Sequence, residues 1–254
     1  MIISYAQNFE DVMLERAFAN VEAGFWIDVG AWDPDVDSVT RHFSDRGWRG
    51  VNCEPNPHYF NLYRDRRPRD INLGLAIGSK PGRASMTLIH GTGMSTFDRS
   101  IAAGHAKLEY RQEETEVEIR TLDSIFKEYA PADVHFLKID CEGAEPDVIA
   151  SCDFRKHRPW IILVESTLPL TREETHGAWE PALLAAGYRF VYFDGVNRFY
   201  VSEEHADLKR HFETPPNVFD GFMVDRMMQH GAYLEDLRRA EARAKKGWFA
   251  RLFS

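Results

Sequence analysis

Short apolar runs rich in β-branched residues alternate with helical patterns along most of the chain. Polar residues or turn signals bound each run, which is typical of strands that are buried on both faces of a sheet. The stretches between the runs carry apolar residues at helical spacing. Alternation of this kind predicts an α/β fold with a mostly parallel sheet. The expected strands are 25–29, 50–54, 71–77, 134–140 and 160–165, and the expected helices include 4–20, 39–45, 123–129 and 179–186.

The end of this pattern predicts an antiparallel hairpin. Residues 188–193 and 198–201 form two strand runs, and Asp194-Gly195-Val196-Asn197 between them is a hairpin signal. Two further runs, 84–90 and 117–122, are expected as outer strands of the sheet. These elements predict one domain over residues 1–222, with its core at 25–202.

Beyond Asn217 the pattern changes, and residues 223–254 are expected to form a separate helical tail. One long polar helix is expected over Met223–Ala244. The sequence from Arg238 to Phe253 is basic with interleaved aromatic residues, as in segments that lie on a membrane surface or contact a protein partner. A frayed or self-associating helix is the alternative, and self-association would give a homo-oligomer.

Composition narrows the class of protein. The chain has 254 residues and a formal net charge of -9, which argues against general nucleic-acid binding. The three cysteines show no metal-binding spacing, and the N-terminus lacks a signal-peptide pattern. No apolar run approaches the ~20 residues that span a bilayer. These features predict a cytoplasmic protein, with the inner face of the membrane as the place where the tail could bind.

Acidic residues end four of the expected strands: Asp28, Glu54, Asp140 and Glu165. The carboxyl ends of parallel strands meet at one edge of a sheet, where open α/β sheets bind their ligands. A single acidic residue there would be an ordinary start of a loop. Four at the same edge predict a ligand site.

The first two strand ends suit a nucleoside ligand. Gly30 follows Asp28 in a turn and would let the backbone approach the ligand, while Glu54 would accept hydrogen bonds from ribose hydroxyls. Ser38 lies at the start of a helix, where free backbone N–H groups can bind an anion such as a ligand carboxylate.

The other two strand ends suit the reacting group. Asp140 and Glu165 could hold a divalent cation such as Mg²⁺ through oxygen ligands, and the metal would lower the pKa of a substrate hydroxyl. Alternatively, one of them acts directly as a general base. In either case Asp140 and Glu165 are the expected catalytic residues.

A nicotinamide-dependent oxidoreductase is a competing α/β interpretation. Its Gly-x-Gly-x-x-Gly turn lets a pyrophosphate approach the backbone, whereas the turn here is Gly30-Ala31-Trp32-Asp33-Pro34-Asp35. The second and third glycines are missing, and nearby acids would repel a pyrophosphate. A cationic ligand such as S-adenosylmethionine suits this turn better.

Several stretches match one known family, and the run from Lys138 to Glu145 is the most specific. Through these stretches the chain resembles the FkbM family of S-adenosylmethionine-dependent methyltransferases. The resemblance covers roughly residues 25–170. Its motifs are Ile27–Ala31, Cys53–Pro57, Ala76–Gly78, Arg120–Asp123 and Leu137–Glu145.

The resemblance implies a Rossmann-like, seven-stranded methyltransferase sheet and O-methylation of a sugar hydroxyl on a glycan, polysaccharide or glycoconjugate precursor. A non-catalytic scaffold that binds partners through the tail is the alternative function. The loops 91–96 and 194–198 are the candidates for contacts with the acceptor, through Thr92, Ser95, Asn197 and Arg198. The cofactor contacts that the resemblance implies are Asp28, Gly30, Ala31, Glu54, Pro55, Ala76, Ile77 and Asp140, with Tyr5 and Gln7 closing over the methionine end.

Overall fold

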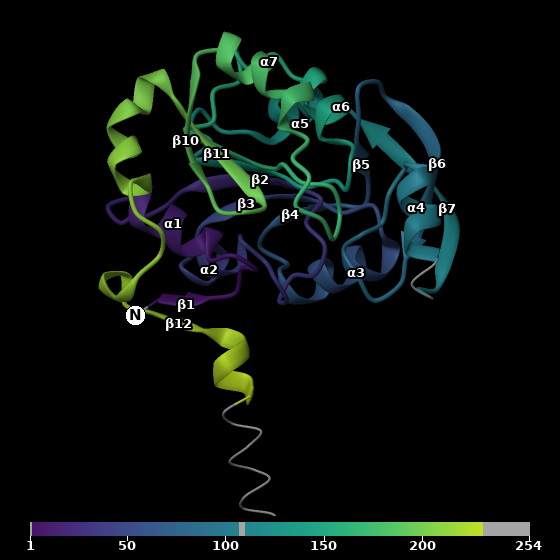
Figure 1. Ribbon diagram of the computed structural model, residues 1–254, viewed down its shortest axis with the longest axis horizontal. Coiled ribbons are helices and arrows are strands. Elements are labelled where there is room, and N and C mark those ends of the chain that lie inside the picture. The colour runs from purple at the N-terminus through teal and green to yellow at the C-terminus, as the bar shows by residue number, and fades with distance from the viewer. Residues whose placement is uncertain (1, 107–109, 231–254) are drawn as a thin grey trace, which may run out of the picture.

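A large sheet runs through the centre of the protein (Figure 1). The structure is a computed structural model that describes residues 2–106 and 110–230. Within these residues the sheet has seven strands, and only the second strand in spatial order runs antiparallel to its two neighbours. That order is β10 (Tyr188–Phe193), β11 (Asn197–Ser202), β9 (Ile161–Glu165), β8 (Phe136–Ile139), β2 (Phe25–Val29), β3 (Arg49–Cys53) and β4 (Ile71–Leu73).

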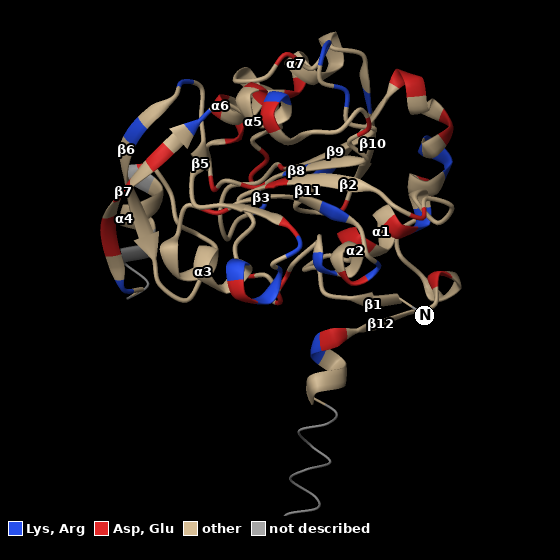
Figure 2. Cartoon of the chain, turned by 180° about the vertical axis from the view of Figure 1, so that it is seen from behind, with Lys and Arg blue, Asp and Glu red and all other residues tan. Residues whose placement is uncertain are grey.

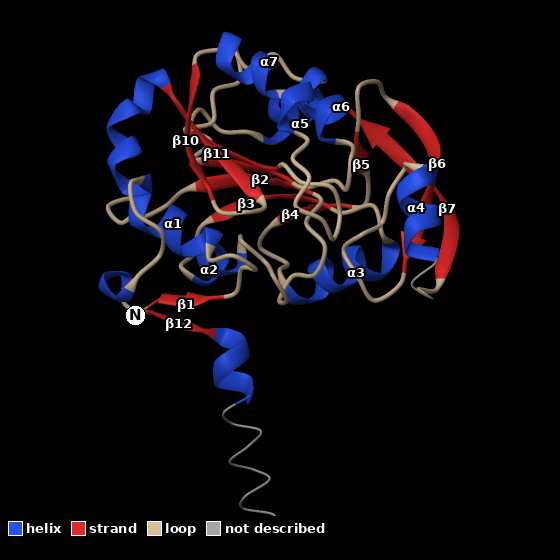
Figure 3. Ribbon diagram, in the orientation of Figure 1, coloured by secondary structure: helices blue, strands red, loops and turns tan. Residues whose placement is uncertain are grey.

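Helices cover both faces of this sheet (Figure 3). Alternate strand residues enter two separate apolar clusters: in β2, Trp26 packs into one and Ile27 and Val29 into the other. Because both faces are buried, the strands read as continuous apolar runs. One cluster includes residues of α1 (Glu10–Ala17), α2 (Arg41–Asp45) and the 3-10 segment η2 (Glu203–Phe212), and the other includes residues of α5 (Leu122–Tyr129), α6 (Glu145–Ala150) and α7 (Glu180–Ala185).

Two smaller sheets lie beside the main one. The first contains β5 (Ala76–Ile77), β7 (Gln112–Arg120) and β6 (Gly82–Ile89) in that order. The second pairs β1 (Ile2–Ser4) with β12 (Phe222–Val224) in parallel, so it joins segments from opposite ends of the described chain. The remaining elements are α3 (Pro57–Arg66), α4 (Arg99–Ala106), η1 (His176–Ala178) and η3 (Val218–Asp220).

The predicted α/β class, the large mostly parallel sheet and the antiparallel hairpin are confirmed. The single strand predicted over 71–77 is wrong, because the chain leaves the main sheet after Leu73 and re-pairs as β5 with β7. The runs 84–90 and 117–122 are also not outer strands of the main sheet. They pair with each other, as β6 and β7, in the separate sheet.

Both ends of the described chain differ from the predicted helices. The helix predicted over 4–20 is limited to Glu10–Ala17, because the Asp11 carboxylate accepts hydrogen bonds from the Ser4 hydroxyl and the Tyr5 and Ala6 backbones. The tail helix does not begin at Met223, since that residue lies in β12; helical residues start at 225. The rest of the tail, 231–254, lies outside the described residues. Among the helices that are described, none is long and apolar enough to cross a membrane.

Candidate functional site

A cavity of about 440 Å³ opens at the carboxyl ends of the central parallel strands. Strand β2 lies between β3 and β8, so the chain continues to one side of β2 first and returns on the other side later. Open α/β sheets bind ligands at such a point, where strand order reverses. Thirteen of the residues predicted for the site line this cavity: Gln7, Asp28, Gly30, Ala31, Ser38, Glu54, Pro55, Ala76, Ile77, Thr92, Ser95, Asp140 and Glu165.

The turn after β2 requires a glycine at its centre. Gly30 has a φ of +79°, and a Cβ atom there would lie 1.7 Å from the backbone oxygen of Asp140. The N–H groups of Gly30 and Ala31 both donate to the Cys53 carbonyl, at 3.1 and 3.2 Å. The turn is therefore fixed against β3 on one side and packed against the end of β8 on the other.

Glu54 is held at the end of β3 by two backbone donors. Its carboxylate accepts from the Trp32 N–H at 2.8 Å and from the Asn56 N–H at 2.7 Å. Burial raises the pKa of Glu54 to about 8, although these two donors act to lower it. Glu54 lines the cavity, and its two backbone donors fix the orientation of its carboxyl group. A site that recognises hydroxyl groups needs an acceptor that is oriented in this way.

Lys138 is a site residue that the sequence analysis missed. Its ammonium nitrogen lies 3.1 Å from Asp140 Oδ2, 3.4 Å from Asp28 Oδ1 and 3.2 Å from the Gly30 carbonyl oxygen. Burial alone would lower the pKa of Lys138, but the two carboxylates raise it, so the side chain is charged. The available signal was a lysine inside an otherwise apolar strand run, where a buried cation needs acidic partners.

Three carboxyl groups meet at the ends of β8 and β9. In Asp140, Glu142 and Glu165, one carboxylate oxygen of each lies within 4.8 Å of the others. Burial and the charges of Asp140 and Glu142 raise the pKa of Glu165 well above its usual range. Burial and the charge of Asp140 likewise raise the pKa of Glu142 to about 9. Neighbouring carboxyl groups of this kind retain protons near neutral pH.

Backbone geometry brings Glu142 to the cavity. Glu142 has a left-handed φ of 51°, and Gly143 follows with a φ of 98°. The Glu145 carboxylate holds the loop by accepting from the N–H groups of Cys141 and Gly143, at 2.9 and 3.2 Å. The sequence analysis did not assign Glu142 to the site; the Cys141-Glu142-Gly143 turn after a strand was the available signal.

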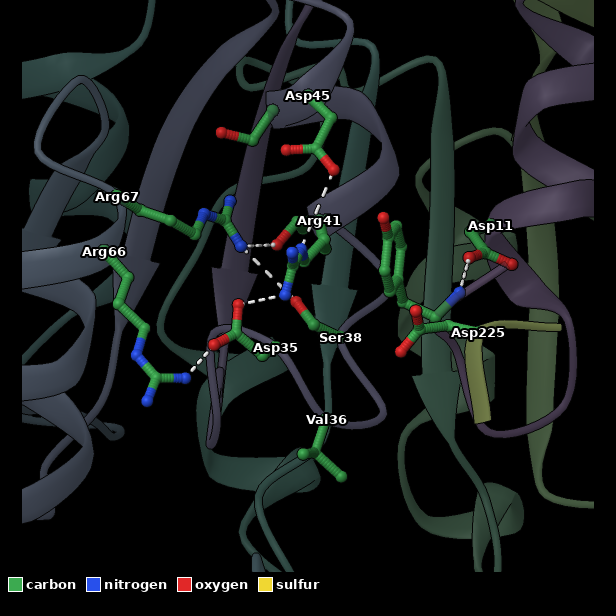
Figure 4. A network of polar contacts seen from close by, with 12 residues as sticks. Asp11, Asp35, Val36, Ser38, Arg41, Asp45, Arg66, Arg67 and Asp225 are labelled. Carbon is green, nitrogen blue, oxygen red and sulfur yellow. Dashed lines mark hydrogen bonds and ion pairs between the residues drawn. The ribbon is translucent and has the colours of Figure 1, made fainter. Parts of the chain in front are cut away.

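The side chain of Tyr5, predicted to contact the cofactor, has another partner in this structure. Tyr5 is not among the residues that line the cavity. Its ring lies under the guanidinium of Arg41, 4.5 Å from the ring centroid. Arg41 in turn pairs with Asp35, which also pairs with Arg66 (Figure 4). These ion pairs lie beside Ser38, which lines the cavity (Figure 4). Acidic and basic segments are interspersed over the whole fold (Figure 2).

Two residues that were predicted to contact the acceptor also have other partners. Arg198 lies in β11, and its guanidinium pairs with Glu174 and Glu180, both at 3.1 Å. Asn197 is buried and donates from Nδ2 to the Glu10 carboxylate at 2.9 Å. Neither residue is in the lining of the cavity, whereas Val196 and Glu10 are. The predicted loop 194–198 therefore reaches the cavity through Val196 and not through Asn197 or Arg198.

The loop 91–96 does reach the cavity, but its hydroxyl groups have internal roles. Thr92 Oγ1 donates to the Ile89 carbonyl at 3.0 Å, and Ser95 Oγ accepts from the Ile89 N–H at 3.2 Å. Gly93 packs on the Trp32 ring, at 3.2 Å from the position of a Cβ atom. The loop is thus a folded wall of the cavity.

Comparison with known proteins agrees with this geometry. A family model described as the methyltransferase FkbM domain matches residues 28–190, which is more than half of the chain and includes every central parallel strand except the first residues of β2. A comparison with curated protein sequences found no match. The matched region contains Gly30, Glu54, Lys138, Asp140 and Glu165. The chain therefore belongs to the FkbM methyltransferase family.

Proposed function

We propose that this methyltransferase uses S-adenosylmethionine to methylate a sugar hydroxyl of a glycan, polysaccharide or glycoconjugate precursor. The observation that carries the proposal is the convergence of the Gly30 turn, Glu54 and the Asp140–Glu165 carboxyl groups on one cavity. The family supports methyl transfer in general. The side chains of the cavity support the choice of cofactor, whereas oxygen as the acceptor atom and a sugar as the substrate are inferences from the family resemblance.

The lining of the cavity fits the proposed cofactor. The Gly30 turn leaves backbone accessible without a side chain, and the oriented Glu54 carboxylate can accept hydrogen bonds from ribose hydroxyls. Asp28 Oδ1 is buried and accepts no hydrogen bond from the described residues, although the Lys138 ammonium nitrogen lies 3.4 Å away. Trp32 and Tyr59 pack edge to face, with ring centroids 5.9 Å apart, and give an apolar wall suited to a base.

The bound cofactor would supply an electrophilic methyl group on a sulfonium. The protein's own task is to orient the acceptor hydroxyl and to take its proton. Glu165 can take this proton only in its ionised form, which burial and the neighbouring acids disfavour, so Asp140 is the better candidate for the base. Asp140 is held beside it by Lys138 and can orient the hydroxyl or share the proton.

A divalent cation at Asp140 and Glu165 remains a prediction. The carboxylates of Asp140, Glu142 and Glu165 offer the hard oxygen ligands that Mg²⁺ prefers. Lys138 already neutralises part of their charge, so the cluster can also work as a set of carboxyl groups without metal. Measuring activity with magnesium and with a chelator separates these two mechanisms.

The test of the proposed function is calorimetric titration with S-adenosylmethionine, S-adenosylhomocysteine and NAD. We expect binding of the two adenosyl ligands only, and weaker binding in Glu54→Gln. Glu128→Gln, on the exposed surface, is the matched control and should bind like the unchanged protein. Binding of NAD alone would overturn the proposal in favour of an oxidoreductase. Binding of none of the three would favour the non-catalytic scaffold.

The acceptor needs a second assay. Purified oligosaccharides and sugar nucleotides are incubated with protein and S-adenosylmethionine, and the products are examined by mass spectrometry. We expect a gain of one methyl group on a sugar oxygen. Transfer to nitrogen or to a protein side chain would contradict the proposed acceptor while leaving the methyltransferase assignment intact.

A further inference from the structure

Glu10 is a buried carboxyl group in the cavity for which the proposed mechanism has no task. It is the first residue of α1, and only 3% of it is exposed. It lines the cavity together with Gln7 from the preceding segment and Val196 from the β10–β11 turn. Glu10 is therefore far from Asp140 and Glu165 along the chain, but it lines the same cavity.

An amide group from a nearby residue and another from the β10–β11 hairpin hold this carboxylate in place. The backbone N–H of Asn8 donates to Glu10 Oε2 at 2.7 Å, and Asn197 Nδ2 donates to Glu10 Oε1 at 2.9 Å. Asn197 is itself fixed by Asp194, which accepts from its side chain at 3.1 Å and from its backbone at 2.7 Å. Each oxygen of a carboxylate can accept two hydrogen bonds, so capacity remains for a ligand.

Glu10 differs from two other acids of the cavity, Asp28 and Asp140, in its charge balance. Asp28 and Asp140 share the ammonium of Lys138. Among the described residues Glu10 makes no ion pair, and the charged groups that act most on it are the acids Asp194 and Asp11. Burial and Asp194 raise the pKa of Glu10 to about 8. A buried carboxylate held only by neutral donors is costly unless a cation joins it.

We propose that Glu10 is the recognition site for an ammonium group of a ligand bound in the cavity. The inference rests on the proposed function for the identity of that ligand. The ammonium could belong to the methionine moiety of the cofactor or to an amino sugar of the acceptor. In either case a charge-assisted hydrogen bond to Glu10 would replace the missing cation.

The experiment compares the unchanged protein with Glu10→Gln by calorimetry. S-Adenosylhomocysteine carries the amino-acid moiety, and 5′-methylthioadenosine lacks it. If the cofactor supplies the ammonium, Glu10→Gln weakens S-adenosylhomocysteine binding roughly 10- to 100-fold, as for a hydrogen bond to a charged group, and leaves 5′-methylthioadenosine unchanged. Glu22→Gln, elsewhere on the chain and outside the cavity lining, is the matched control.

If the acceptor supplies the ammonium, the two adenosyl ligands bind Glu10→Gln normally. Glucosamine binding is then lost in the variant, whereas N-acetylglucosamine, which has no ammonium, binds both proteins alike. Equal binding of all four ligands by both proteins overturns the proposal. If the unchanged protein binds neither S-adenosylhomocysteine nor 5′-methylthioadenosine, the proposed function is contradicted. The role of Glu10 is then decided by the comparison of glucosamine with N-acetylglucosamine.

A folding control keeps the result interpretable. Glutamine has the size of glutamate and removes a charge that burial disfavours, so thermal unfolding of Glu10→Gln should occur at the same temperature or higher above pH 8. Glu10→Asp retains the charge on a shorter side chain. We expect it to recover part of the lost affinity, which a purely structural role of the side-chain length would not produce.

Discussion

The ammonium nitrogen of Lys138 lies 3.1 Å from Oδ2 of Asp140, at the boundary between β8 and the cavity. The same nitrogen is 3.4 Å from Asp28 on the neighbouring strand. One buried cation therefore fixes two acids that end adjacent parallel strands. It also places a positive charge beneath a cavity whose lining is otherwise rich in carboxyl groups.

Replacing Lys138 should destabilise the fold. Lys138→Met removes the cation but leaves Asp28 buried, and loss of one partner of a buried pair costs roughly 3–5 kcal/mol. Denaturant unfolding followed by circular dichroism measures this change. Adding Asp28→Asn should restore part of the lost free energy, because the unpaired charge is then gone. Additive losses in the double variant would show that the two side chains are not coupled.

Asp140→Asn should separate binding from chemistry. Asparagine keeps the shape of the side chain and can still accept from Lys138, but it cannot take a proton from the acceptor and, without a negative charge, binds a metal more weakly than aspartate. We expect S-adenosylhomocysteine affinity within a few-fold of the original and no detectable turnover. Full activity of this variant would remove Asp140 from the catalytic machinery and leave Glu165 as the candidate.

The stability of the ligand-free protein should fall as pH rises from about 5 to 9. A carboxyl group with a raised pKa keeps its proton longer in the folded chain than in the unfolded one, so the free energy of unfolding decreases between the two pKa values. Glu142 contributes to this fall because burial, Asp140 and Glu145 raise its pKa to about 9, against the opposing charge of Lys138. Lys138 remains protonated throughout and adds no slope in this range.

Glu142→Gln should reduce that slope. Glutamine has no proton to lose, so the difference in melting temperature between pH 5.5 and pH 9 should be smaller than in the original by a few degrees, as each kcal/mol moves Tm by about 2–4 °C in a chain of this size. Glu10, Glu54 and Glu165 keep the remaining slope at the same sign. An unchanged difference would place the Glu142 carboxyl in water rather than in the acidic cluster.

Two glycine substitutions should have unequal costs. Gly30 and Gly47 both have positive φ values, 79° and 93°, so alanine is strained at either by roughly 1–2 kcal/mol. A Cβ atom at Gly47 meets nothing within 4 Å, whereas at Gly30 it meets the Asp140 carbonyl. We expect Gly47→Ala to fold with a modest loss of stability and Gly30→Ala to lose several times more. Equal melting temperatures would contradict the close packing of β2 against the end of β8.

The positions of the strand ends could be predicted from the sequence. Apolar runs locate the strands, and parallel strands bring their ends to one edge, so Asp28, Glu54, Asp140 and Glu165 could be assigned to one site before any contact was known. Each of the four lines the cavity. This prediction needs only the apolar runs in the sequence and the rule that parallel strands end at the same edge of a sheet.

The missed features depend on which segments become neighbours. Lys138 is important because β8 lies beside β2, a pairing that the alternation of residues does not encode. The break between β4 and β5 has the same origin, since Ala76 and Ile77 gain backbone partners in β7 rather than in the main sheet. Glu10 gains its role from Asn197, which the sequence analysis had assigned to the acceptor instead.

The parallel pairing of β1 with β12 has a consequence for the order in which the protein can form. Ile2 lies opposite Phe222, so β1 has no partner until almost all of the described chain has been made. Such a distant contact adds loop-closure entropy and forms late. Gln7 and Glu10 follow β1 directly, and Glu10 also waits for Asn197. The cavity wall that is synthesised first is therefore completed last, and a nascent chain should gain full ligand affinity only after β12 has emerged.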